Sequence, residues 1–225
     1  MMRNKLRNED IGIWSKQNGI EWGSALKWEG KKILQKFRTY KYAYAISNKH
    51  GLQLECEDFV HPNQKIFLKK ITLHNDSRKY QDLTLFFQQD IGIQNGTAFF
   101  SMSNRTIFHE DKGRYVLFNG MIDNRGISQY TTWQDNDFYN KNFLNIENGS
   151  LLLNPIAAGQ VKSAFSIETT MLPYEIKRGY YWAIAANDLH EIQQLNEYMQ
   201  RDPEKLVKDF IEETFGSKVM IPQIN

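Results

Sequence analysis

Alternation of apolar and polar residues with a period of two most constrains how this chain folds. Phe67, Ile71 and Leu73 share one side of a pleat, although Lys69 interrupts their row, and the segment 161–168 alternates in the same way. Residues two apart point to the same face of a strand, so the pattern predicts strands with one buried and one solvated face.

Similar short segments recur along most of the chain. Turn residues such as Asn95-Gly96 and Asn148-Gly149 separate them. The further strands that we expect lie at 33–37, 40–46, 52–57, 83–87, 97–100, 105–108, 115–119, 127–132, 151–153 and 180–186. So many short strands at this spacing predict an all-β fold, an antiparallel sandwich or barrel, and not an α/β fold.

The period changes near Asp188. This residue can cap a helix, and Glu191 three residues later completes a capping-box arrangement. Asp202-Pro203 then starts a second helix, because proline is tolerated at the first helical position. The apolar residues at helical spacing are Leu189, Ile192, Leu195 and Met199, then Leu206, Val207, Phe210 and Ile211. The predicted division is a β domain at 1–187 and a helical linker or tail at 188–225.

The charges do not point to a nucleic-acid or membrane partner. The chain carries 28 basic and 26 acidic residues, a net charge of +2, and no basic stripe is present. No apolar run approaches the roughly 20 residues of a membrane span, and the opening residues lack the apolar core of a signal peptide. We therefore expect a cytoplasmic protein that binds neither nucleic acid nor membrane.

Motifs of common catalytic and metal sites are missing. The five histidines do not pair at metal-ligand spacing, Cys56 is the single cysteine, and no phosphate loop or G-x-S-x-G motif occurs, so we expect no cofactor and no metal. Glu55 and Glu57 lie roughly 7 Å apart on one strand face, a spacing that suits glycoside hydrolysis. Their solvated setting favours an ordinary polar strand face. Asp135 and Asp137 lack the later ligands of a calcium loop.

Aromatic residues are the remaining candidates for a binding site. The candidates for stacking on sugar rings are Trp14, Trp22, Trp28 and Trp133. Tyr40, Tyr42 and Tyr44 share one strand face and would serve equally. The same aromatic residues are typical of a core or a half-buried sheet face, which is the competing interpretation.

Seven segments occur in a characteristic order over roughly residues 11–200. They are IFLKKITLHN (66–75), LTLFFQQDIGI (83–93), TAFFSMSNRTIFH (97–109), YVLFNG (115–120), QYTTW (129–133), NGSLLLNPIAAGQVKS (148–163) and GYYWAIAAN (179–187). Together they resemble the N-terminal domain of family 15 glycoside hydrolases of the prokaryotic glucoamylase and glucodextranase type. This resemblance implies an antiparallel supersandwich of the galactose-mutarotase type, with the helices after Asp188 as the linker to a catalytic barrel.

The chain also departs from that family. The resemblance places both catalytic glutamates in an (α/α)₆ barrel downstream, and this sequence has no counterpart of either glutamate. Its front is shorter than usual, and the segment 134–148, which we expect to form a long exposed loop, is rich in asparagine. No catalytic residue is therefore transferred, and we expect a chain without enzymatic activity.

Three functions follow as hypotheses. In the first, the domain packs against a family 15 barrel, in the same chain or as a separate subunit, through Leu206, Phe210 and Phe215. In the second, it is a carbohydrate-binding module that holds an α-glucan oligosaccharide on its aromatic residues. In the third, it is a mutarotase-like enzyme, for which His74 or His109 with Glu55 or Glu57 would supply the acid and base.

Overall fold

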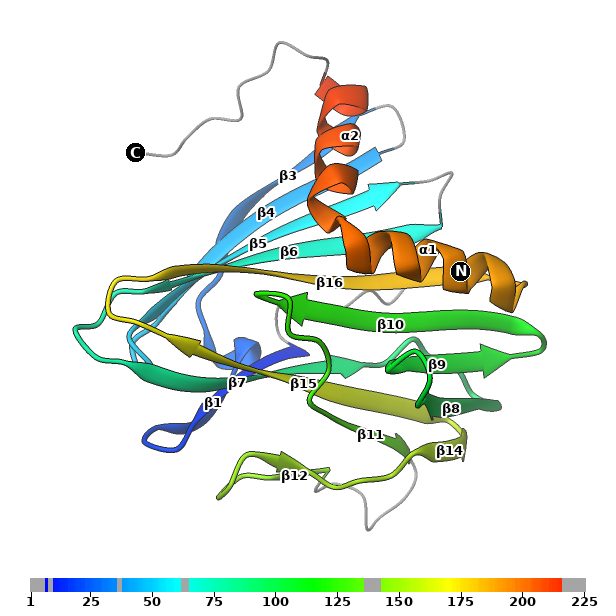
Figure 1. Cartoon of the computed structure of the whole chain (residues 1–225), viewed down its shortest axis with the longest axis horizontal. Coiled ribbons are helices and arrows are strands. Elements are labelled where there is room, and N and C mark those ends of the chain that lie inside the picture. The colour runs from blue at the N-terminus through cyan, green and yellow to red at the C-terminus, as the bar shows by residue number, and fades with distance from the viewer. Residues whose placement is uncertain (1–6, 8–9, 36–37, 62–64, 136–142, 216–225) are drawn as a thin grey trace.

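Two antiparallel sheets form the body of the protein (Figure 1). The computed structural model describes residues 7, 10–35, 38–61, 65–135 and 143–215. The smaller sheet has five strands in the order β11-β15-β7-β1-β2. They are β1 (Ile11–Ser15), β2 (Gly19–Trp22), β7 (Gln81–Gln89), β11 (Gln129–Gln134) and β15 (Val161–Met171). The predicted all-β antiparallel sandwich is confirmed.

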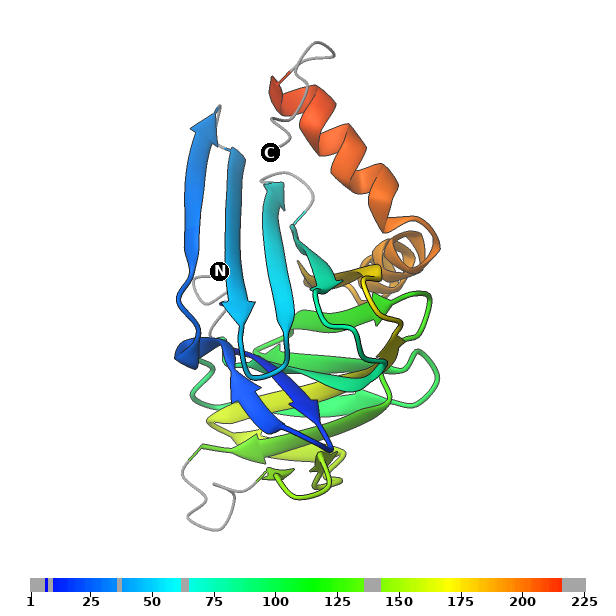
Figure 2. The ribbon, with the colours of Figure 1, turned by 90° about the vertical axis from the view of Figure 1, so that its left-hand side faces the viewer.

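The larger sheet has nine strands in the order β14-β8-β9-β10-β16-β6-β5-β4-β3. Its members are β3 (Glu29–Gln35), β4 (Arg38–Ser47), β5 (Leu52–His61), β6 (Ile66–Asn75), β8 (Gly96–Ser101), β9 (Thr106–Asp111), β10 (Arg114–Ile122), β14 (Ile156–Gly159) and β16 (Ile176–Ala186). Strands β3 to β5 extend past the smaller sheet and stand upright above it in Figure 2.

The main core lies between the two sheets. Alternate residues of each strand enter it, among them Phe67, Ile71 and Leu73, as the period-two pattern predicts. Lys69 occupies the same inward face and is fully buried, where its ammonium group forms an ion pair with the carboxylate of Asp58 on the neighbouring strand. The interruption of the apolar row is thus a charged cross-strand pair, because a buried cation requires a partner.

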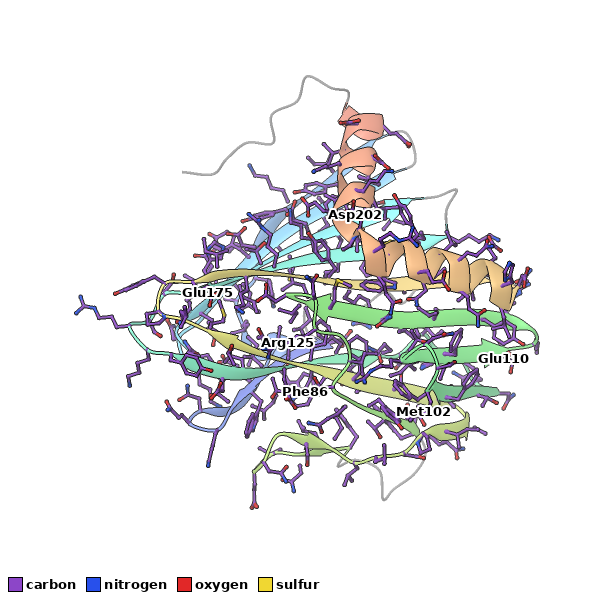
Figure 3. The ribbon with its side chains drawn as sticks, in the orientation of Figure 1. Phe86, Met102, Glu110, Arg125, Glu175 and Asp202 are labelled. Carbon is purple, nitrogen blue, oxygen red and sulfur yellow. The ribbon has the colours of Figure 1, made fainter. Side chains whose placement is uncertain are left out.

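Two helices follow the last strand. Helix α1 (Leu189–Arg201) begins after Asp188, whose carboxylate accepts a hydrogen bond from the backbone N–H of His190 at 2.9 Å. Glu191 instead lies 3.6 Å from Lys65 in an ion pair. Helix α2 (Pro203–Phe215) begins after Asp202, which marks the corner between the helices in Figure 3. No helix of the described residues is long and apolar enough to cross a membrane.

Both helices cover the outer face of the larger sheet. Their apolar stripes meet a second cluster of buried residues there, in which the Phe210 ring contacts Phe59 edge-on at 5.3 Å between ring centroids. Of the apolar residues that the sequence places at helical spacing, all but Leu189 pack against this chain's own sheet, whereas Leu189 is 41% exposed. The change from strand to helix falls between Ala186 and Leu189.

A small hairpin covers part of the outer face of the smaller sheet. It consists of β12 (Leu144–Asn145), within the region 134–148 expected to be an exposed loop, and β13 (Ser150–Leu151), which begins just after that region. Leu144 and Leu151 pack on Phe86 and form a third apolar cluster. Part of the expected loop is thus folded onto the body, and its residues 136–142 lie outside the described residues.

Candidate functional site

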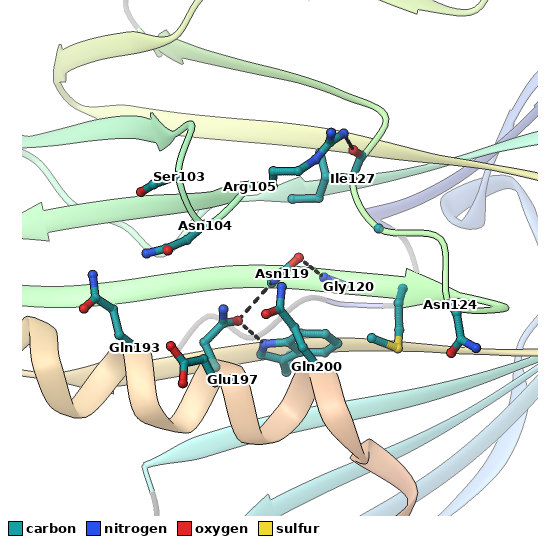
Figure 4. A pocket seen from close by; sticks show the side chains of 14 residues that line it. Ser103, Asn104, Arg105, Asn119, Gly120, Asn124, Ile127, Gln193, Glu197 and Gln200 are labelled. Atoms are coloured by element: carbon teal, nitrogen blue, oxygen red, sulfur yellow. Dashed lines mark hydrogen bonds between the residues drawn. The ribbon is translucent and has the colours of Figure 1, made fainter.

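A pocket of about 530 Å³ opens between α1 and the larger sheet. Figure 4 shows it bounded by α1 on one side, by the loops that follow β8 and β10 on the other, and floored by β10 and β16. Six of the lining residues carry side-chain amides: Asn104, Asn119, Asn124, Gln193, Asn196 and Gln200. We call this cavity the amide pocket.

The floor of the amide pocket is a fixed hydrogen-bond network. Asn196 of α1 accepts two hydrogen bonds at its Oδ1, from the indole N–H of Trp182 at 3.0 Å and from Nδ2 of Asn119 at 3.1 Å. Asn119 in turn accepts the backbone N–H of Gly120 at 2.8 Å. All three side chains are buried, so the network both attaches α1 to the sheet and holds the amides in one orientation.

The rim is built from exposed side chains. Gln193, Glu197 and Gln200 recur at helical spacing along one face of α1. Opposite them, Arg105 has a left-handed backbone with φ of 51°, and its guanidinium donates to the carbonyl of Ile127 at 2.6 Å. This bond ties together the two loops that form the far wall (Figure 4).

The chemistry of the pocket suits hydrogen bonding to a ligand, and its described lining lacks the carboxyl pair of glycoside hydrolysis. Glu197 is the single carboxylate among the described residues that line it, whereas glycoside hydrolysis requires two carboxyl groups on opposite sides of the bond. Each amide can donate and accept hydrogen bonds. Among the described residues, no group of three or more side chains is placed to hold a metal ion.

Three of the four predicted sugar-stacking tryptophans lie on the outer face of the smaller sheet. Trp14 donates its indole N–H to the carbonyl of Ile146 at 2.9 Å, and its ring lies against Gly149 so closely that a Cβ there would stand 2.5 Å from it. Trp133 stacks on Phe143 at 4.6 Å between centroids and is 6% exposed.

Trp22 completes this group. Its ring is tilted against Phe143 at 6.2 Å and against Phe86 at 6.5 Å, so it packs into the third apolar cluster. Trp28 lies elsewhere, packed on the main core with its indole N–H donated to the carbonyl of Gly23 at 2.8 Å. The structure therefore does not bring the four rings together, and sugar stacking on them stays a prediction.

The predicted partner contacts lie on α2. Leu206 and Phe210 are 7% and 2% exposed because they pack on the larger sheet. The side chain of Phe215 lies outside the described residues. Contact with a partner through Leu206 and Phe210 stays a prediction, and it would require α2 to leave the sheet.

The carboxylates considered for catalysis lie beside basic side chains. Glu55 lies 3.1 Å from Nε2 of His74, and Glu57 accepts a hydrogen bond from the hydroxyl of Tyr40 at 3.0 Å and pairs with Lys70 at 3.7 Å. All of these groups are on the outer face of the larger sheet, outside the amide pocket. His74 and Glu55 thus lie side by side on a strand face, outside the amide pocket.

The other candidates are also separated from the amide pocket. His109 is fully buried on the inner face of β9, away from both glutamates. Asp135 forms an ion pair with Lys162 at 2.7 Å, and Asp137 lies outside the described residues. Tyr42 and Tyr44 lie on the same outer face as Glu55, with Tyr44 donating to Glu29 at 2.7 Å.

Sequence reasoning missed the amide pocket, although one signal was present. Asn196 stands between Ile192 and Met199 on the apolar stripe of α1. Asn119 similarly follows the apolar run YVLF of β10. A polar amide on an apolar face indicates a specific buried partner, because an unpaired buried amide is costly.

Comparisons with known proteins identify structures with the same fold. No family model matches the sequence, and no curated protein matches it significantly. A bacterial glucoamylase solved in complex with acarbose has a TM-score of 0.64 at 12% identity, covering 91% of this chain and 30% of the glucoamylase. A putative kojibiose phosphorylase from the human microbiome has a TM-score of 0.53 at 12% identity, covering 93% of this chain and 27% of that protein. These similarities show the fold alone.

Proposed function

We propose that this chain is the non-catalytic sandwich module of a glycoside hydrolase of the family 15 type. In this role it packs against an (α/α)₆ catalytic barrel, either within one longer chain or as a separate subunit. The observation that carries the proposal is the extent of the structural match. The structural alignment with the bacterial glucoamylase covers 91% of this chain, whereas the chain spans about 30% of the glucoamylase's length.

The described part of the chain supports a non-catalytic role in two ways. The amide pocket contains a single carboxylate, and Glu55 and Glu57 lie outside it on a strand face, next to His74 and Lys70. Glycoside hydrolysis instead places two carboxyl groups on either side of the bond that is cleaved.

Hydrolysis assays test the first half of the proposal. The purified chain is incubated with maltose, isomaltose and soluble starch, and released glucose is measured. We expect no release above a control in which Glu197, Glu55 and Glu57 are all replaced by Gln. Glucose release by the parent chain that this triple variant loses would overturn the non-catalytic role.

Complex formation tests the second half. The neighbouring gene that encodes an all-helical barrel is identified in the genome and co-expressed with this chain. If the barrel sequence instead continues in the same reading frame, the two are expressed as one protein and as separate halves. We expect one co-eluting species on size-exclusion chromatography, and less barrel activity when this chain is omitted. A barrel that is fully active and stable alone, with no co-elution, would contradict a supporting role.

A further inference from the structure

We propose that the amide pocket is a binding site for a neutral, hydroxyl-rich ligand, and specifically for a pyranose unit of a glucose oligosaccharide. The binding chemistry follows from the residues of the pocket. The choice of a glucose unit among hydroxyl-rich ligands rests on the proposed carbohydrate-related function.

The size of the cavity suits a small ligand. Its volume of about 530 Å³ falls inside the range of about 300–1,000 Å³ that is typical of small-molecule sites. Its walls come from three separate parts of the chain: the loops that follow β8 and β10, and helix α1. A ligand seated there would therefore be enclosed on several sides, as Figure 4 shows.

The floor presents hydrogen-bond donors in a fixed direction. The indole N–H of Trp182 is a donor only, so it must face Oδ1 of Asn196, and this sets the orientation of that amide. Oδ1 of Asn196 also accepts from Asn119, whose own Oδ1 accepts the N–H of Gly120. Both oxygens are thus occupied, and within the described residues Nδ2 of Asn196 donates no hydrogen bond. The two N–H bonds of Asn196 Nδ2 and the second N–H bond of Asn119 Nδ2 therefore remain to donate to ligand oxygens.

The rim supplies groups that both donate and accept. The exposed amides are those of Gln193, Gln200 and Asn124. A sugar hydroxyl also donates and accepts hydrogen bonds, so each amide can either donate to a ligand hydroxyl or accept from one. Arg105 and Glu197 contribute one positive and one negative charge. Their balance gives no net attraction for a phosphate or a cation and favours an uncharged ligand.

Two adjacent glutamines on α1 provide a matched test. Gln193 lines the pocket, whereas Gln194 does not line it and bonds to His190 at 2.9 Å. Both side chains are exposed, so replacement of either by Ala removes no core packing. The test compares a Gln193→Ala/Glu197→Ala double variant with Gln194→Ala, after thermal unfolding confirms that both retain the parent stability.

The measurement is a titration of the ¹⁵N-labelled chain with maltose and with isomaltose, followed by NMR. We expect saturable shifts of the side-chain amide signals of Asn119 and Asn196. We also expect at least about a tenfold weaker affinity in the double variant, the loss of roughly one good polar contact, and no change in Gln194→Ala.

Three outcomes would overturn the inference. The first is a titration without saturable shifts. The second is a set of shifts centred on Trp14, Trp22 and Trp133, which would move sugar binding to the outer face of the smaller sheet. The third is saturation by N-acetylglycinamide with no response to either sugar, which would identify a peptide segment as the occupant. A flat sugar titration leaves the barrel-packing proposal intact, because complex formation tests that proposal separately.

Discussion

Protonation of His109 should destabilise the fold as the pH falls. Its ring lies in the main core beside Phe118, with 5.0 Å between centroids, and Nε2 is 2.7 Å from Oγ of Ser163. Ser163 donates to Oε1 of Gln89 at 2.8 Å, so Nε2 carries the proton that Ser163 accepts. Nδ1 is buried and has no partner among the described residues.

Burial lowers the pKa of His109 to about 3 from its ordinary value of 6.5, and the nearby carboxylate of Asp90 offsets only part of this effect. The unfolded chain therefore binds a proton at a higher pH than the folded chain does. The contribution of the neutral His109 to the free energy of unfolding is therefore fully present above about pH 6.5, and it is lost progressively as the pH falls toward 3. The loss is about 1.4 kcal/mol per pH unit, or roughly 3 kcal/mol between pH 7 and pH 4.

The perturbation is His109→Gln, which keeps a donor for Ser163 and removes the titrating ring. Free energies of unfolding are measured by urea titration from pH 7 to pH 4 for the parent, for this variant and for His190→Gln. His190 is an exposed histidine on α1, and we expect its variant to follow the parent curve.

We expect His109→Gln to be less stable than the parent at pH 7, because it loses a ring contact, but to lose roughly 3 kcal/mol less on acidification. Carboxylates that titrate in the same range are common to all three proteins and cancel in the comparison. Parallel curves for His109→Gln and the parent would refute the reasoning, since they would mean that the buried ring takes up a proton without penalty.

Two further predictions concern the charged pair of the core and the attachment of α2. Asp58→Asn should cost about 3–5 kcal/mol in urea unfolding because it leaves the buried Lys69 cation without its carboxylate, and adding Lys69→Met should recover most of that loss; equal stability of the single and double variants would contradict this. Phe210→Ala should cost about 3–5 kcal/mol and raise amide hydrogen exchange in α2, while the exposed Lys208→Ala should stay within about 0.5 kcal/mol of the parent. Unchanged exchange in Phe210→Ala would show that α2 is held to the sheet by other contacts.

The sequence by itself determined the elements whose signal is local. Alternation places Phe67, Ile71 and Leu73 on one face of β6, and the structure buries all three in the main core. Asp188 and Pro203 mark the starts of α1 and α2, because caps and proline act on the first turn alone. Strands β1, β2, β12 and β14 were missed as strands; β2 and β14 contain no fully buried residue, so neither alternates between a buried and a solvated face.

Only the tertiary structure decided what lies beside what. Pairing of β16 with β6 joins residues about a hundred positions apart, and no local pattern encodes that choice. The same long-range packing directs Trp14, Trp22 and Trp133 onto the smaller sheet and buries Leu206 and Phe210 of α2 against the larger sheet. The amide pocket arises in this way as well: Asn119, Trp182 and Asn196 come from three elements, and they meet because α1 folds back across β16 and β10. Hydrophobic burial draws these surfaces together without regard to sequence separation, whereas alternation and capping report only on neighbours along the chain.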